Sequence, residues 1–116
     1  KYKEAVEMLE NVLKQNSRNA EAYYMMSRCQ QRMGGKHLED ALNNIKRALI
    51  INKEEPRFFC QIGRVEMSRE NFDKAEKYYK TALAWDNENR EAKYLIEKLR
   101  EARQKGFFAK FKRRRK

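Results

Sequence analysis

The sequence predicts an all-α fold, an α-solenoid built from antiparallel helix pairs, and three observations lead to this prediction. A stripe of apolar residues recurs three times, beginning at Ala5, Ala41 and Ala75, at intervals of 36 and 34 residues. A second pattern, which starts with an aromatic residue, recurs between the stripes. The 116 residues include one proline and four glycines, so the composition suits a single helical array.

Each stripe consists of four residues at spacings of 4, 3 and 1. The three copies are Ala5, Leu9, Val12, Leu13; Ala41, Ile45, Ala48, Leu49; and Ala75, Tyr79, Ala82, Leu83. In a helix of 3.6 residues per turn this spacing places all four side chains on one face. Small residues recur at the first and third places, where they let a neighbouring helix approach closely. Unrelated helices would not keep this order, so each stripe marks one helix of a repeated unit.

The second pattern lies between the stripes and shows that the unit contains two helices. Its first copy is Tyr23, Met26 and Ser27, and its second copy, 36 residues later, is Phe59, Ile62 and Gly63. Together the two patterns resemble the tetratricopeptide repeat family, in which an aromatic, Leu-Gly and Tyr mark the first helix and Ala, Phe, Ala and Pro mark the second. The resemblance covers nearly the whole chain and implies a superhelix of stacked pairs.

The elements follow in order from this repeat. Residues 1–16, with a helix expected over 2–15, match only the second helix of a unit, so we expect a truncated repeat whose apolar face is partly exposed. Helices over 20–33 and 37–51 form the repeat of residues 20–53, in which a two-residue insertion near Gly34, Gly35 and Lys36 lengthens the interval. Helices over 56–69 and 72–85 form the repeat of residues 56–87, and Pro56 suits the first turn of its helix.

The last expected helix covers residues 89–104 and caps the array over residues 88–105. Lys93 stands where the repeat has its aromatic residue, and Glu97 stands where it has its glycine. A terminal helix must cover the last apolar face while presenting polar residues outward, so such departures suit a cap.

Residues 106–116 form a basic aromatic tail. From Arg103 to Lys116 there are eight Lys or Arg and no acid, which supplies eight of the net eleven positive charges. The expected contact residues are Phe107, Phe108, Phe111, Lys112, Arg113, Arg114, Arg115 and Lys116. Four interpretations stay open: a nuclear-localisation or nucleic-acid patch, an anionic membrane surface, docking of the phenylalanines on the last helices or on a partner protein, and calmodulin-type capture.

The sequence predicts no catalytic, metal or cofactor site. His37 is the sole histidine, so a His-based catalytic pair or multi-His metal site cannot be built. Cys29 and Cys60 are 31 residues apart, which is neither a zinc spacing nor a redox motif. No strand or complete glycine pattern surrounds Gly34, Gly35 and Lys36, so this segment is a turn rather than a phosphate loop. Acidic residues mostly lie at helical spacing from Lys or Arg, as on solvated faces.

The binding surface is expected on the first helices, which line the groove of a stacked array. With Tyr23, Met26, Phe59 and Ile62 assigned to the core, the residues expected in the groove are Tyr24, Arg28, Gln31, Arg57, Cys60, Gln61, Arg64, Tyr94 and Lys98. Arg28, Arg57 and Arg64 suit an extended acidic or phosphorylated peptide, because guanidinium groups hold carboxylates and phosphates by forked hydrogen bonds. The sequence agrees equally well with the alternative that these arginines are ordinary solvated side chains.

One function that the resemblance implies is contradicted by the residues at the matching positions. Tetratricopeptide modules that hold the acidic C-terminus of a chaperone use Lys and Asn on the first groove helix, Asn on the next, and Lys with Arg on the third. The matching positions here are Tyr24 and Arg28, then Gln61, then Glu91 and Leu95. We therefore expect this carboxylate clamp to be absent.

The sequence thus predicts a protein-interaction scaffold or adaptor segment of a larger multi-protein assembly, and no enzyme. Other proteins are the expected partners, which bind in the concave groove, and the basic C-terminal tail is expected to serve as an anchor. The alternative is a ribonucleoprotein or nucleic-acid-associated factor, in which the tail contacts phosphate backbone together with Arg28, Arg57 and Arg64. No secretory signal and no apolar run near the length of a membrane span is visible, so we expect a cytoplasmic or nuclear location.

Overall fold

The structure is a computed structural model that describes the backbone of residues 1–115 and the side chains of residues 1–106. All elements within the described backbone are helical. In order they are α1 (Tyr2–Gln15), α2 (Ala20–Met33), the 3-10 helix η1 (Gly35–His37), α3 (Leu38–Ile51), α4 (Pro56–Ser68), α5 (Phe72–Trp85) and α6 (Arg90–Arg115).

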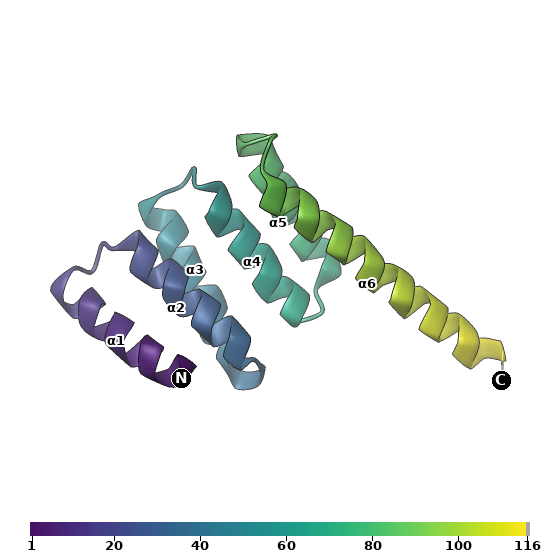
Figure 1. The fold of residues 1–116 in the computed structure, drawn as a ribbon, viewed down its shortest axis with the longest axis horizontal. Helices are drawn as coiled ribbons and strands as arrows, with labels where there is room; N and C mark the ends of the chain where they lie inside the picture. Colours follow the sequence, from purple (N-terminus) through teal and green to yellow (C-terminus); the bar gives the residue numbers. More distant parts are fainter. Residues whose placement is uncertain (116) are drawn as a thin grey trace.

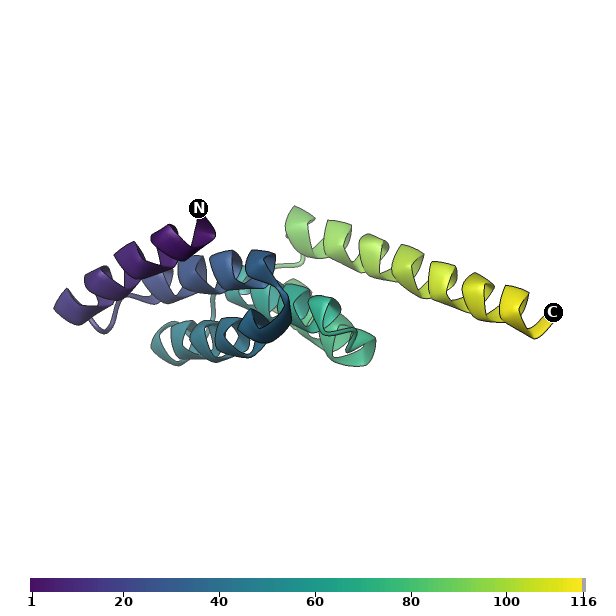
Figure 2. The same cartoon turned by 90° about the horizontal axis from the view of Figure 1, so that it is seen from below.

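The helices form an extended array of antiparallel pairs, α2 with α3 and α4 with α5, flanked by α1 and α6 (Figure 1). The array measures 58 × 32 × 18 Å along its principal axes. Figure 2, seen from below, shows α3 and α5 along one edge, whereas α1 and α6 lie on the opposite edge, to either side of α2. The predicted α-solenoid is therefore confirmed, with α2, α4 and α6 as the first helices of successive pairs.

Local side-chain chemistry fixes where the helices begin. The side chain of Asn19 accepts a hydrogen bond from the backbone N–H of Ala22 at 3.0 Å, which caps the N-terminus of α2. Asn89 caps α6 in the same way through the N–H of Ala92 at 2.9 Å. Helix α4 begins with Pro56, whose missing N–H costs nothing in the first helical turn.

The insertion between α2 and α3 is a tight turn that depends on glycine. Gly34 and Gly35 have φ angles of 69° and 53°, in the left-handed region that side chains with a Cβ rarely adopt. The single 3-10 turn of η1 follows, and α3 begins directly after it at Leu38. The extra residues are thus absorbed in the turn, and they leave the α2–α3 pairing intact.

The core consists of two clusters that share α4. One joins α2, α3 and α4, and the other joins α4, α5 and α6. The small residues of the stripes on α3 and α5 lie within these clusters and have no exposed surface: Ala41, Ala48, Ala75 and Ala82. On α1, by contrast, no residue is fully buried, and Met8 keeps 70% of its surface exposed. This helix contacts α2 alone within the described chain.

The paired helices α4 and α5 approach each other closely at Gly63 on α4. A Cβ built at this position would overlap the ring of Tyr79 on α5. Tyr79 itself is only 1% exposed, so its ring cannot move into solvent to make room. Gly63 therefore lets α4 and α5 pack with the large ring of Tyr79 between them.

Polar side chains also tie successive repeats together. Ser27 Oγ donates to the carbonyl of Ala41 at 2.8 Å within the α2–α3 pair, and Gln61 Nε2 on α4 donates to Ser27 Oγ at 3.2 Å. Gln61 Nε2 also lies 3.3 Å from Gln31 Oε1. The two bonds of Gln61 cross from one repeat to the next, and leaving a buried partner unpaired costs about 1–3 kcal/mol. They therefore fix how α2 and α4 are rotated toward each other.

Helix α6 is longer than the sequence predicts. The expected cap ends at residue 105, but the helix continues through Gly106 to Arg115. No proline follows residue 105, and the Lys, Arg and Ala of the tail are good helix formers. Cations near the C-terminus of a helix are also favoured by the helix dipole. A single glycine costs only about 1 kcal/mol in a helix and does not stop it.

We predict opposite effects for alanine at two glycines. Gly63→Ala forces the new Cβ against Tyr79 and lowers the free energy of unfolding by about 1–3 kcal/mol. Gly106→Ala meets no atom within 4 Å and removes a weak helix former, so it leaves stability unchanged or raises it by up to about 1 kcal/mol. Thermal unfolding followed by circular dichroism measures both, at about 4–8 °C per kcal/mol. Equal midpoints for the two variants would contradict the close approach at Gly63.

Candidate functional site

The candidate site lies on the exposed surface of the first helices α2, α4 and α6, which we call the first-helix face. Figure 2 shows α1 and α6 extending beyond α2 on this side of the array, whereas α3 and α5 lie on the other side. The centre of the face is a cavity of about 250 Å³ lined by Arg28, Gln31, Arg32 and Arg64. We call it the arginine cavity.

Two of its three arginines carry charge that no carboxylate compensates. Arg64 Nη1 forms an ion pair with Glu91 Oε1 of α6 at 2.6 Å, and both side chains are largely shielded from solvent. Within residues 1–106, no carboxylate lies at ion-pair distance from Arg28 or Arg32. The guanidinium of Arg28 lies 5.8 Å from the centroid of the Tyr24 ring. The cavity therefore presents two positive charges that are available to an anion.

A second, more apolar cavity adjoins the arginine cavity. It has a volume of about 400 Å³, and its lining residues are Tyr2, Met25, Arg28, Cys29 and Arg32. Met25 and Tyr2 keep 47% and 41% of their surface exposed. We call it the Met25 cavity. Arg28 and Arg32 of α2 line both cavities.

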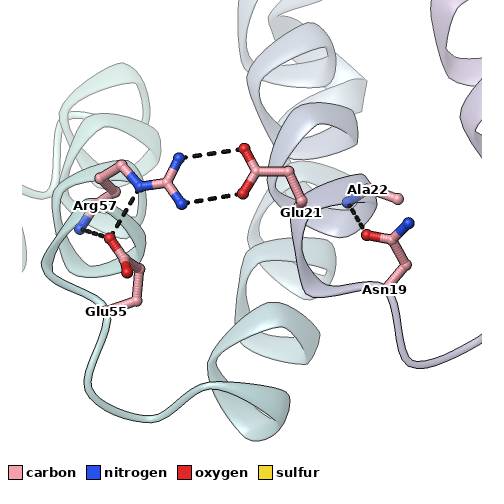
Figure 3. A network of polar contacts seen from close by, with 5 residues as sticks. All are labelled: Asn19, Glu21, Ala22, Glu55 and Arg57. Atoms are coloured by element: carbon pink, nitrogen blue, oxygen red, sulfur yellow. Dashed lines mark hydrogen bonds and ion pairs between the residues drawn. The ribbon is translucent and has the colours of Figure 1, made fainter.

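Arg57, in contrast, is already engaged by two carboxylates. Its Nη1 and Nη2 donate to Oε1 and Oε2 of Glu21 at 3.2 and 3.0 Å, and its Nε donates to Glu55 Oε1 at 2.9 Å (Figure 3). The hydrogen bonds to Glu21 and to Glu55 hold the pKa of Arg57 above its ordinary value. The guanidinium also lies 5.1 Å from the Tyr24 ring centroid. Arg57 thus connects α2 to α4 and is not a free cation of the site.

Three residues that the sequence places in the groove are buried instead. Tyr24 is 6% exposed and packs on Phe58 with ring centroids 5.4 Å apart, and Gln61 and Cys60 have no exposed surface. The reason is that an inner first helix has several neighbours: α2 contacts α1, α3 and α4, and α4 contacts α2, α3, α5 and α6. The buried part of the helix circumference is therefore wider than one apolar stripe. The expectation that these three residues are exposed in the groove is wrong.

The other expected residues are accessible to different degrees. Arg28, Gln31 and Arg64 come together at the arginine cavity, as the repeat spacing suggests. Tyr94, 59% exposed, and Lys98 lie apart from that cavity on α6, where Lys98 Nζ is 5.4 Å from the Tyr94 ring centroid. Their contact with a partner stays a prediction. The tail residues Phe107, Phe108, Phe111, Lys112, Arg113, Arg114, Arg115 and Lys116 lie outside the described side chains.

Sequence analysis missed Arg32, Met25 and the Arg64–Glu91 ion pair. Arg32 follows Arg28 by four residues, a spacing that places both on one helix face, so this signal was present in the sequence. The ion pair joins residues on α4 and α6, and its geometry depends on the packing of those two helices. Such a contact has no sequence signal of its own.

The described residues offer no other site of recognised chemistry. No group of three or more His, Cys, Asp or Glu side chains within residues 1–106 is arranged to hold a metal ion. Both cysteines are free thiols. None of the described helices combines the length and the apolar character needed to cross a membrane.

Comparison with known proteins identifies the family. Sequence profiles of the tetratricopeptide repeat family match residues 1–59 and residues 56–89. The chain therefore belongs to the tetratricopeptide repeat family. A comparison with curated protein sequences found no significant match.

Solved structures with the same fold are tetratricopeptide domains of low sequence identity. The first such domain of human RPAP3 is 19% identical, with a TM-score of 0.81 over 90% of this chain and 81% of that one. The Arabidopsis OM64 domain is 21% identical, with a TM-score of 0.78 over 87% and 82%. The first domain of Spaghetti (RPAP3), bound to the HSP90 peptide SRMEEVD, is 19% identical, with a TM-score of 0.77 over 87% and 79%. At this identity the likeness concerns the fold alone.

We predict that the two thiols differ in reactivity. Cys29 is half-buried beside the Met25 cavity, whereas Cys60 has no exposed surface, and burial raises the pKa of its thiol to about 12. Reaction with a chromogenic disulfide near pH 8 should therefore modify Cys29 rapidly. Cys60 should react only when the chain unfolds, at a rate at least about 1,000-fold lower than that of Cys29.

Mass spectrometry of the modified protein assigns each site, and the same reaction in denaturant should modify both thiols at similar rates. Rapid modification of Cys60 in the folded chain would show that the contact between α4 and α5 is not closed as described.

Proposed function

We propose that this chain is a protein-interaction module that binds extended peptide segments along the first-helix face, as a scaffold or adaptor segment of a larger multi-protein assembly. One observation carries the proposal. The centre of the face holds two uncompensated arginines between an apolar cavity and a polar cavity, formed by side chains of α1, α2 and α4. Concave sites with apolar walls and a few placed polar groups are typical of ligand recognition.

The solved structures agree with this use of the fold. The first domain of Spaghetti is bound to an HSP90 peptide, and the second domain of human RPAP3 is in complex with the HSP70 peptide SGPTIEEVD. These facts concern those proteins, and they support the proposal because the same fold accepts an extended peptide there.

We propose that the partner is not the chaperone C-terminus held by a carboxylate clamp. Tyr24 and Gln61, at two of the matching positions, are buried, and Leu95 is 8% exposed. Glu91, at a position where the clamp has a cation, is negatively charged and paired with Arg64. The charge at this end of the face is thus opposite to what a carboxylate requires.

We propose binding rather than catalysis. Catalytic acids and bases usually have shifted pKa values in a cleft. Here burial raises the pKa of Cys60 and of Tyr79 within the core, and a hydrogen bond from Lys80 lowers the pKa of Glu76 on the exposed side of α5. None of these groups lines the arginine cavity or the Met25 cavity.

A nucleic-acid-associated role is the second candidate, because residues 103–116 carry eight positive charges of the net eleven. The first-helix face adds less to this role than the sequence suggests, since Arg57 and Arg64 are paired with carboxylates. A cytoplasmic or nuclear location fits either candidate and remains part of the proposal.

We predict that peptides selected from a random displayed library bind the first-helix face. In ¹⁵N-labelled protein, the selected peptides should shift amide resonances of α2 and α4 most, because α2 lines both cavities and α4 lines the arginine cavity. Resonances of α3 and α5 away from the site serve as the internal control. Failure to select any peptide, or shifts centred on α3 and α5, would contradict the proposed function.

We predict that labelled RNA and duplex DNA bind only weakly at physiological salt, with a dissociation constant above about 1 µM, as expected for non-specific phosphate contacts. A version ending at Gln104 should show a smaller salt dependence, because it lacks the seven Lys and Arg residues of positions 105–116. Tight binding at physiological salt that disappears with the tail would favour the nucleic-acid role over the protein-interaction role.

A further inference from the structure

Helix α6 leaves the array after Arg103. The Nη2 of this residue donates to Asp73 Oδ1 at 2.9 Å, and its guanidinium lies 6.0 Å from the ring centroid of Phe72, the first residue of α5. The α6 backbone continues to Arg115, which is a rise of about 18 Å beyond Arg103. Figure 1 shows this part of the helix extending past the ends of α4 and α5. We call residues 104–115 the α6 extension.

Helical register separates the aromatic positions of the extension from the packed side of α6. The residues buried against α4 and α5 share one arc of the helix circumference: Ala92, Leu95 and Leu99. At about 100° per residue, the positions of Phe107, Phe108 and Phe111 share another arc about 100° wide, whose centre lies about 130° from that of the first. Register and the length of the extension therefore both argue against docking of these phenylalanines on the last helices of the array.

The aromatic arc begins only where the helix leaves the array. In the preceding turns the same arc holds Lys93, Glu97 and Arg100, and all three residues are exposed. Charged residues on this side suit a helix that caps the array. The change from charged to aromatic residues therefore serves a contact outside the fold.

The charge of this segment has a single sign. Residues 105–116 contain seven Lys or Arg and no Asp or Glu. Such a segment attracts an anionic surface and repels a second copy of this chain, whose net charge is +11. A helix that combines an aromatic arc with many cations suits the interface of an anionic membrane, where aromatic rings enter the acyl boundary and cations meet the headgroups. Long Lys and Arg side chains reach those headgroups from beside the arc.

Two other partners fit these observations less well. A protein groove recognises an amphipathic helix through apolar anchors spread over two turns or more, whereas the aromatic arc covers only positions 107–111, little more than one turn. Phosphate contacts to a nucleic acid require cations but no aromatic arc, and stacking on unpaired bases does not require rings on one helix face. A short helix without neighbours is marginal in water, so burial of the arc in lipid also stabilises the helix.

We propose that the α6 extension is a membrane-surface helix that binds anionic lipid. The three phenylalanines enter the interface, the Lys and Arg residues bind the phospholipid headgroups, and the array of α1 to α5 stays in water beside the membrane. This inference is independent of peptide binding on the first-helix face. It names the surface chemistry of a second attachment point.

The test measures sedimentation of the full chain with phosphatidylcholine vesicles that contain about 30% phosphatidylserine, at physiological salt. We expect binding at least about tenfold stronger than to vesicles of phosphatidylcholine alone, and weaker binding as the salt concentration rises. A version ending at Gln104 should bind at least about tenfold more weakly. The control variant Lys74→Gln with Lys77→Gln removes two exposed charges from α5 and should keep its affinity within about twofold.

An exchange of two residues separates the aromatic arc from charge and composition. Phe111→Arg combined with Arg113→Phe leaves the net charge and the composition unchanged. The three phenylalanines then occupy positions 107, 108 and 113, which are spread around the whole circumference at intervals of about 100° to 140°. We expect this exchange variant to bind the anionic vesicles at least about tenfold more weakly. Circular dichroism confirms that each variant is folded.

Tryptophan emission shows which part of the chain meets the lipid. Trp85 is the sole tryptophan, is 52% exposed, and ends α5 close to the start of α6 at Arg90. Positions 90 and 108 of α6 are about 27 Å apart along the helix axis, so we expect the emission of Trp85 to stay unchanged when vesicles are added. Phe108→Trp in a Trp85→Phe background should instead shift its emission to shorter wavelength and be quenched by brominated lipid.

Four outcomes would overturn the inference: no binding to the anionic vesicles, equal affinity of the exchange variant, a shift of the Trp85 emission, or unchanged emission of the bound Phe108→Trp variant. Tighter binding of RNA or duplex DNA than of anionic vesicles at the same salt would assign the extension to nucleic acid instead. The failure of the proposed function is distinguished by the peptide selection. The absence of any selected peptide on the first-helix face would remove that function and leave the lipid-binding helix in place.

Discussion

Small residues at the contacts between paired helices determine how closely the helices pack in this chain. Ala41 and Ala48 on α3 and Ala75 and Ala82 on α5 are fully buried, and Gly63 leaves room for the ring of Tyr79. The pairs α2–α3 and α4–α5 both pack through small residues, and α3 and α5 lie along one edge of the array with α6 on the opposite edge (Figure 2). The binding surface that we propose exists because of this repeated geometry, since α2 and α4 must lie side by side to form the arginine cavity.

Polar contacts between repeats refine this arrangement. Gln61 bonds to Ser27 and Gln31 beneath the surface, and Arg57 joins α4 to Glu21 at the start of α2 (Figure 3). The exposed ion pairs contribute little stability, about 0–1 kcal/mol each, but the buried bonds fix the rotation of the helices. Carboxylates thereby neutralise some arginines of the face and leave others available. The specificity of the site follows from which cations remain unpaired as much as from which are present.

The fold follows from the sequence because a helical repeat is specified by local patterns. The stripes beginning at Ala41 and Ala75 predict the buried faces of α3 and α5, and the expected bounds of α1 and α2 agree with the structure. The site was predictable only in part. Arg28 and Arg64 follow from the repeat, but the burial of Gln61 and the pairing of Arg64 with Glu91 depend on contacts between first helices. Those contacts depend on how whole helices pack against each other, and the apolar pattern within one helix does not specify that packing.

The central claim is that the first-helix face, and α2 above all, is where a partner peptide binds. A crystal structure of the chain with the tightest peptide from an unbiased selection tests it most directly. The account predicts an extended peptide across α2 and α4, with acceptor oxygens within about 3 Å of the guanidinium groups of Arg28 and Arg32. A peptide seated on α3 and α5, or one that leaves both arginines in contact with solvent alone, would contradict it.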